Sequence, residues 1–253
     1  MRYLLSSRNV GVLAQLAWSR VLLAFDFDGT LAPIVPDRTG ACMRKRTCQL
    51  FARACALYPC AVISGRSQSD VLPRLAGAAV KYVVGNHGLE PSSELASFAR
   101  ETARAAPLLR QALVSLAGID VEDKRYSLAV HYRRSRHKTD ARAAIGSAVA
   151  ALPCRMRIVP GKQVVNIVPE GAPHKGDAVV QLRKLAQADT ALYVGDDFTD
   201  EDVFALDQPG RLLTVRVGSS RSSAAAYFLR SQREIDTVLS KLSALREKGH
   251  GVP

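Results

Sequence analysis

Residues 24–31 read AFDFDGTL, so that two aspartates, Asp26 and Asp28, directly follow the apolar run at 21–25. A short apolar run that ends in a polar, glycine-containing turn is typical of a buried strand in an α/β sheet. Such sheets bind ligands just beyond the carboxyl ends of their strands. The stretch therefore predicts an α/β fold and places Asp26 and Asp28 at a site.

Apolar runs and helical patterns alternate through most of the chain. Alternation of this kind predicts a parallel sheet whose strands are joined by helical crossovers. The expected strands of this sheet are residues 21–25, 60–63, 81–84, 191–194 and 212–217, and the expected helices are residues 44–57, 68–75, 175–188 and 232–246.

The middle of the chain, residues 91–170, breaks this rhythm and predicts a separate α+β module. A long alanine-rich helix comes first, and a hairpin around the turn Pro160-Gly161-Lys162 comes last. The expected helices are residues 94–116 and 139–151, and the expected strands are residues 120–122, 126–133, 156–159 and 163–168. The module is expected as an insert between 1–90 and 171–253.

Composition limits the partners and the location. Arg and Lys outnumber Asp and Glu by 35 to 23, a net charge of +12, which favours an anionic partner such as a phosphorylated metabolite. Basic residues interleaved with stacking aromatics are not found, so we expect no nucleic acid, and no segment has the length of a membrane span. Five cysteines without CxxC spacing favour reduced thiols. We expect a cytoplasmic monomer that does not bind a membrane.

The two aspartates after the first strand suit covalent phosphoryl chemistry. Asp26 is a candidate nucleophile toward phosphorus, which needs a cation to offset the repulsion between two anions. Asp28 points to the same side, and it can protonate a leaving oxygen and later activate water. An Asx turn that caps the strand end is the alternative for an isolated DxDGT pattern.

Two other element ends carry groups that suit a phosphate. Ser64 and the amides that follow it can hold a phosphoryl oxygen at a helix N-terminus, although Ser-Gly is also an ordinary turn. Lys175 opens a predicted helix and can offset the charge on a phosphoryl group, although a surface lysine is the default explanation in isolation.

The segment GDDFTDED, residues 195–202, crowds five acidic side chains at a strand end. Carboxylates gathered in this way suit Mg²⁺, whose preferred ligands are oxygen atoms. Some of them are expected to cap the next helix, with Asp200 or Glu201 in its first turn. The first one or two, Asp196 and Asp197, are the better ligand candidates.

In this order, DFDGT, SGR, Lys175-Gly176 and GDDFTDED resemble the motifs of the haloacid dehalogenase-like (HAD) phosphatases. The resemblance implies a Rossmann-like parallel-sheet core with an inserted α+β cap, Mg²⁺ as cofactor and an aspartyl-phosphate intermediate. The implied roles are Asp26 as nucleophile, Asp28 as general acid and base, Asp26, Asp28 and Asp196 as metal ligands, Asp197 and Asp200 in support of the metal, and Ser64, Gly65 and Lys175 as phosphate-binding residues.

A narrower resemblance is to the trehalose-6-phosphate phosphatases. It rests on Ala32-Pro33-Ile34, GNHGLE at 85–90, VEDK at 121–124, AVHYR at 129–133 and Pro160-Gly161-Lys162. It implies that the substrate is a sugar phosphate, trehalose 6-phosphate first of all. The residues implied to bind the substrate are Arg66, His87, Gly88, Glu122, Lys124, His131 and Asn166. For His131, simple coverage of the sheet is the alternative.

Asn166 departs from that family, which usually has a glutamate there in a pattern like GKxVxE. Asparagine still donates and accepts hydrogen bonds, but it is shorter and uncharged. Open alternatives are a HAD phosphatase for another sugar phosphate or a glycosyl-glycerate phosphate, a non-catalytic domain that binds a sugar phosphate, and a regulatory partner of a synthase. The presence of both Asp26 and Asp28 argues against a silent domain.

Overall fold

The computed structural model describes residues 1–161, 163–206 and 208–250, and these divide into two compact units. Unit 1 comprises Met1–Gly88 and the described residues from His174 onward, and unit 2 comprises Leu89–Pro173. Lys162, in the predicted hairpin turn, lies outside the described residues. Within the described ranges, no helix has the length and apolar character needed to cross a bilayer.

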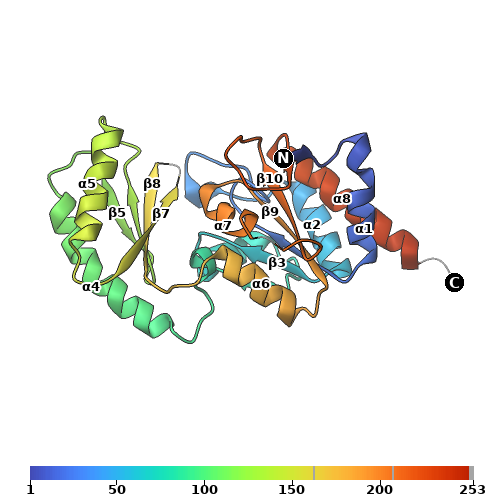
Figure 1. The fold of residues 1–253 in the computed structure, drawn as a ribbon, viewed down its shortest axis with the longest axis horizontal. Helices are drawn as coiled ribbons and strands as arrows, with labels where there is room; N and C mark the ends of the chain where they lie inside the picture. Colours follow the sequence, from blue (N-terminus) through green and yellow to red (C-terminus); the bar gives the residue numbers. More distant parts are fainter. Residues whose placement is uncertain (162, 207, 251–253) are drawn as a thin grey trace. The chain divides into compact units, whose positions relative to one another are not determined.

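Unit 1 is built on a seven-stranded, all-parallel sheet in the order β1-β11-β10-β9-β2-β3-β4 (Figure 1). The predicted parallel sheet is thereby confirmed. The two strands that the sequence patterns missed, β1 and β11, have two and three residues, too few to show a period. The bounds are β1 Arg2–Tyr3, β2 Val21–Phe25, β3 Cys60–Ile63, β4 Tyr82–Val84, β9 Thr190–Gly195, β10 Leu212–Val217 and β11 Tyr227–Leu229.

Helices cover both faces of this sheet because its strands are apolar on both sides. Leu23 and Phe25 point to the face of α1, α2 and α8, whereas Leu22 and Ala24 point to the face of α6 and α7. Figure 1 shows the two helical layers of unit 1. The bounds are α1 Val10–Trp18, α2 Lys45–Leu57, α3 Gln68–Val71, α6 Lys175–Leu185, α7 Glu201–Phe204 and α8 Ile235–His250.

Two predicted helices of unit 1 are shorter than expected, each for a local reason. The helix predicted at 68–75 is α-helical only to Val71 and continues as a 3-10 turn, because Pro73 has no amide hydrogen to donate. The helix predicted at 175–188 ends at Leu185, and Gln187 beyond it takes a left-handed φ of 53°.

Unit 2 is an antiparallel sheet in the order β5-β6-β8-β7, with helices on one face. Leu128, Val130 and Ile167 pack against the helices, so Ala129, His131 and Asn166 face the other side. The strand predicted at 126–133 is shorter, because Lys124 donates to the Ser127 carbonyl in a turn. The bounds are α4 Leu95–Leu113, β5 Asp120–Asp123, β6 Leu128–His131, α5 Lys138–Ala150, β7 Met156–Gly161 and β8 Val164–Pro169.

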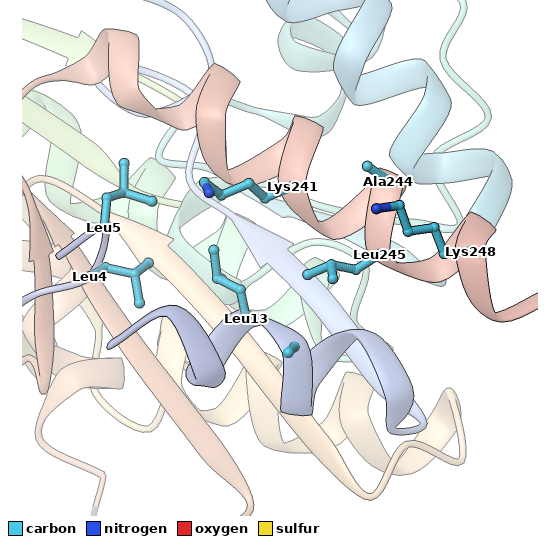
Figure 2. A pocket seen from close by; sticks show the side chains of 8 residues that line it. Leu4, Leu5, Leu13, Lys241, Ala244, Leu245 and Lys248 are labelled. Atoms are coloured by element: carbon cyan, nitrogen blue, oxygen red, sulfur yellow. The ribbon is translucent and has the colours of Figure 1, made fainter. Parts of the chain in front are cut away.

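A pocket of about 200 Å³ lies between the N-terminal segment of unit 1 and α8, and its walls are almost entirely apolar. Leu4 and Leu13 form buried parts of the wall, and Lys241 and Lys248 extend beside the hollow (Figure 2). None of the residues predicted to act on phosphate lines this pocket.

Candidate active site

The strand register brings the predicted motifs of unit 1 to one edge of the sheet. Strand β2 lies between β3 and β9, with Phe25 opposite both Val62 and Val194. Asp26 follows Phe25 directly, and its amide donates to the Val194 carbonyl at 2.9 Å. The side chains after β2, β3 and β9 therefore share the carboxyl edge, where parallel sheets bind ligands.

Lys175, at the start of α6, lies between two carboxylates. Its Nζ is 2.8 Å from Asp26 Oδ1 and 2.8 Å from Asp200 Oδ1, and the residue is only 2% exposed. Burial by itself would lower the pKa of Lys175, but Asp200 and Asp26 outweigh that effect and hold the pKa above its ordinary value. Lys175 is therefore a buried cation that fixes the Asp26 carboxylate, and the surface-lysine alternative is wrong.

Asp200 organises the loop after β9. Its Oδ1 accepts from Lys175 and from the Tyr193 hydroxyl at 2.6 Å, and its Oδ2 accepts from the amides of Asp196 and Asp197 at 2.7 and 2.9 Å. Four hydrogen bonds occupy the lone-pair positions of a carboxylate. Asp200 is therefore placed to hold Lys175 and the loop, whereas Asp197 takes part through its backbone amide.

Tyr193 is a part of this network that the sequence motifs did not single out. It is fully buried on β9, and burial and then Asp200 raise the pKa of its hydroxyl well above the ordinary value. The hydroxyl therefore stays protonated and donates to Asp200. The sequence does carry a signal for Tyr193, because it is the one hydroxyl-bearing side chain in the apolar run at 191–194, which leads into the acidic cluster.

Asp196 supplies the feature that suits a metal ion. Carboxylate oxygens of Asp26, Asp196 and Asp200 lie within 4.8 Å of one another, and Asp196 Oδ1 is buried without a hydrogen-bond partner in the described structure. Gly29, at a φ of 85°, lets the backbone come against Asp196, since a Cβ there would lie 2.2 Å from its carboxylate. Lys175 contacts Asp26 and Asp200, and the four hydrogen bonds of Asp200 leave Asp26 and Asp196 as the available donors, which fit a hard divalent cation such as Mg²⁺.

Burial shifts the titration of two of these carboxyl groups. It raises the pKa of Asp26 to about 7, against the opposing effect of Lys175. It also raises the pKa of Asp196 to about 9, with Asp26 adding to the shift. Without a cation, the negative charge at this edge is therefore costly.

These shifts predict how stability depends on pH and on Mg²⁺. Both pKa values lie above the ordinary pKa of 3.8. These carboxyl groups therefore stabilise the fold fully below a pH equal to that ordinary value, and their stabilisation is lost as the pH rises through about 7 and about 9. Metal ligands must be deprotonated, so we expect the stabilisation by Mg²⁺ to grow over the same range. The measurement is the melting temperature at about pH 6 and about pH 9, in EDTA and in about 10 mM MgCl₂. An equal Mg²⁺ effect at both pH values, or an undiminished effect in Asp196→Asn, would contradict the assignment.

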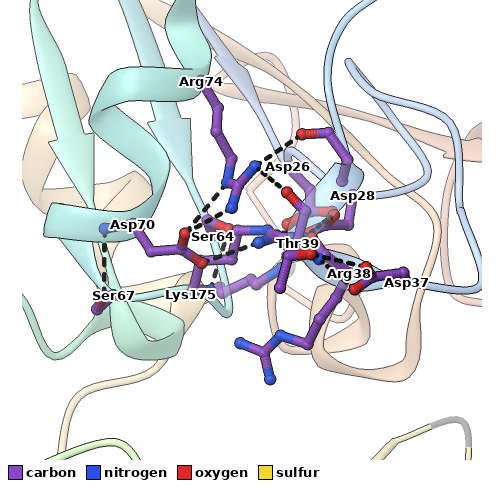
Figure 3. A network of polar contacts seen from close by, with 12 residues as sticks. Asp26, Asp28, Asp37, Arg38, Thr39, Ser64, Ser67, Asp70, Arg74 and Lys175 are labelled. Carbon is purple, nitrogen blue, oxygen red and sulfur yellow. Dashed lines mark hydrogen bonds and ion pairs between the residues drawn. The ribbon is translucent and has the colours of Figure 1, made fainter.

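Asp28 makes a different contact from that of Asp26. Its two carboxylate oxygens accept from Arg66 Nε and Nη2 at 2.6 and 2.8 Å (Figure 3 shows the surrounding network). The side chain of Asp28 is 39% exposed, whereas that of Asp26 is 7% exposed. The two aspartates of the motif are thus held by different cations.

The predicted phosphate loop after β3 lies against the segment after β4. Ser64 is fully buried, and its carbonyl accepts from the His87 amide at 2.9 Å. A Cβ at Gly65 would lie 2.4 Å from the His87 imidazole, and one at Gly88 would lie 2.6 Å from the His174 backbone. Tertiary contacts thus bring SGR, GNHG and the start of α6 together.

The predicted sugar-contacting residues of unit 2 are clustered on its sheet. Glu122 lies opposite Ala129, which lies opposite Asn166, and Glu122 Oε2 is 2.8 Å from His131 Nε2. Lys124 follows β5 and is half-buried. Asn166 is 5% exposed on the sheet face away from α4 and α5.

The sequence also matches known proteins. A family model described as trehalose-phosphatase matches residues 24–233. The trehalose-phosphate phosphatase of Mycolicibacterium paratuberculosis is 31% identical over 247 residues, which cover 90% of this chain and 63% of the relative. The chain thus spans less than two thirds of that relative's length.

Solved structures share the fold. The C-terminal domain of Candida albicans trehalose-6-phosphate phosphatase superimposes with a TM-score of 0.78 at 23% identity, covering 93% of this chain and 97% of that one. The C-terminal domain of a Candida albicans trehalose synthase regulatory protein gives 0.67 at 13% identity, covering 92% and 97%. Because proteins with both descriptions have this fold, the fold alone does not select an activity.

Proposed function

This chain belongs to the trehalose-phosphatase family, and from that premise we propose that it is a Mg²⁺-dependent phosphatase that hydrolyses trehalose 6-phosphate to trehalose and phosphate. One observation carries the proposal. A buried lysine holds the Asp26 carboxylate at the carboxyl edge of the sheet, beside an Asp196 oxygen that lacks a partner. A silent binding domain would have no need of this costly arrangement.

The first chemical step transfers the phosphoryl group to the protein. A carboxylate oxygen of Asp26 attacks phosphorus, and the bond between phosphorus and the sugar oxygen breaks. Asp28 gives its proton to that oxygen, so the sugar leaves as an alcohol. Lys175 keeps the nucleophile in place through its 2.8 Å contact.

The second step regenerates the protein. Water attacks phosphorus, Asp28 takes a proton from it, and the bond between phosphorus and Asp26 breaks to release phosphate. Asp26 and Asp196 would hold Mg²⁺, which when bound offsets the charge between the carboxylates and the phosphate. The carbonyl oxygen of Asp28 is the third candidate ligand, on the motif resemblance.

Phosphate and sugar are assigned to different residues. Ser64 and Gly65, directly after β3, and Lys175, at the start of α6, would bind the phosphoryl oxygens. Glu122, Lys124, His131 and Asn166 of unit 2 stay candidate sugar-binding residues on the motif resemblance, as do His87 and Gly88 of unit 1, and unit 2 would be the cap domain. The cytoplasmic location and the monomeric state stay predictions from the sequence.

The test is phosphate release from trehalose 6-phosphate beside glucose 6-phosphate, sucrose 6-phosphate and mannosyl-3-phosphoglycerate, each with Mg²⁺ and with EDTA. We expect Mg²⁺-dependent turnover selective for trehalose 6-phosphate. Selective turnover of another ester would keep the mechanism and direct attention to Asn166. No turnover of any ester would favour a binding or regulatory domain.

A further inference from the structure

We propose that Arg66 is a positioning residue of the reaction, which holds the Asp28 carboxyl group in the orientation from which it transfers a proton. The inference rests on the proposed function. It gives Arg66 a role other than the sugar contact that the motif resemblance implies. Its basis is the set of contacts that the guanidinium makes within unit 1.

The contact between Arg66 and Asp28 is bidentate. Nε and Nη2 donate to separate oxygens of the same carboxylate, at 2.6 and 2.8 Å. Two parallel hydrogen bonds fix the plane of a carboxylate, which one bond does not. The Arg66 side chain is only 5% exposed, whereas Asp28 is 39% exposed. Arg66 is thus the fixed, buried partner of the pair, and Asp28 is the partner that a ligand can reach.

The guanidinium has almost no donor left for a sugar. Arginine has five N–H donors. Besides the two bonds to Asp28, Nη2 donates to the Arg38 carbonyl at 2.7 Å, and Nη1 donates to Asp70 Oδ2 at 2.8 Å. Four of the five donors are thus committed inside the protein, which argues against substrate contact as the main role.

A second shared carboxylate keeps Arg66 itself in place. Asp70 accepts from Arg66 at one oxygen and from Arg74 Nε and Nη2 at the other, at 3.1 and 2.9 Å. Arg74 also donates to the carbonyls of Thr39 and Ala41 at 2.8 and 3.0 Å (Figure 3). Asp28, α3 and the loop at 38–41 therefore form one network, which restrains the orientation of Asp28.

The role predicts a dependence on the leaving group. Each Asp28 oxygen accepts one bond from Arg66 and keeps a second lone pair, which can carry the proton. When Asp26 attacks phosphorus, this O–H bond of Asp28 breaks and the proton moves to the departing sugar oxygen. A p-nitrophenolate ion is stable without that proton, so p-nitrophenyl phosphate does not need a well-placed acid. A residue that acts through Asp28 must affect the sugar ester far more than the aryl ester.

The experiment compares kcat/KM for trehalose 6-phosphate and p-nitrophenyl phosphate in wild type and Arg66→Lys, with Mg²⁺. This ratio reports the steps up to departure of the leaving group, so hydrolysis of the aspartyl-phosphate does not enter it. Lysine keeps the charge but cannot form the bidentate contact. We expect a loss of about 10- to 100-fold for the sugar ester, mainly in kcat, and less than about threefold for the aryl ester.

Four further variants and their melting temperatures complete the test. Asp28→Asn should show the same selectivity, and the double variant should fall no lower than Asp28→Asn alone. Asp70→Asn should show a weaker loss of the same kind. Arg53→Lys, an exposed arginine on α2, is the control and should change neither ester. If the variants and the wild type have similar melting temperatures, the losses of activity are due to a misplaced Asp28 and not to unfolding.

Equal losses for the two esters, a loss confined to KM, or additive losses in the double variant would overturn the proposal. Turnover of glucose 6-phosphate but not of trehalose 6-phosphate would overturn only the substrate assignment, and the comparison would then use glucose 6-phosphate. A wild-type protein that hydrolyses none of these esters would overturn both.

Discussion

Asp26→Asn is expected to lower kcat for phosphate release by about 10⁴-fold or more, because the amide cannot form the covalent intermediate. The fold should survive. Asparagine resembles the protonated acid, and burial raises the pKa of Asp26 to about 7, so above that pH the wild type carries a buried negative charge that the variant lacks. In EDTA at about pH 8, the melting temperature of the variant should equal or exceed that of the wild type.

The matched control is Asp189→Asn, which changes an exposed aspartate that pairs with Arg20. A surface ion pair contributes little, so this variant should keep its activity. Activity of Asp26→Asn within about tenfold of the wild type would place the nucleophile elsewhere. A large drop in melting temperature would show that Asp26 has a structural role instead.

Lys175→Met is expected to impair both activity and stability. The substitution leaves Asp26 and Asp200 as buried carboxylates without their shared cation, at a cost of about 3–5 kcal/mol in the free energy of unfolding. The nucleophile also loses its anchor, so we expect kcat to fall by about 10²- to 10³-fold. Urea unfolding in EDTA measures the first effect, and phosphate release at saturating substrate measures the second.

Adding Mg²⁺ distinguishes the role of Lys175 in stability from its role in activity. A cation near Asp26 should recover part of the lost stability, whereas the activity should stay low because the carboxylate is no longer held. Lys184→Met is the control, since Lys184 is exposed on the same helix and should change stability by less than about 0.5 kcal/mol. Equal unfolding free energies for Lys175→Met and the wild type in EDTA would contradict the buried ion-pair network.

The α/β fold with its parallel core sheet was predictable from the sequence patterns, as were the strands that carry the motifs, and both the structure and the solved structures of similar fold confirm this fold. Local patterns suffice for this because β2 is an unbroken apolar run that ends in a polar turn, and crossover helices such as α2 are long enough to show a helical period. They fail where the signal is short or where one residue changes the geometry. Strand β11 has three residues, and Pro73 changes the hydrogen bonding after α3.

Tertiary contacts set which charged side chains pair with each other. Lys175 is 149 residues from Asp26 along the chain, and Arg66 is 38 residues from Asp28. No local pattern specifies that one aspartate of the motif pairs with a buried lysine and the other with a buried arginine. Strand register and the packing of α6 set those pairs, because burial makes an unpaired charge too costly to leave in place. The sequence motifs identified the charged residues of the site, and the fold determined which of them pair.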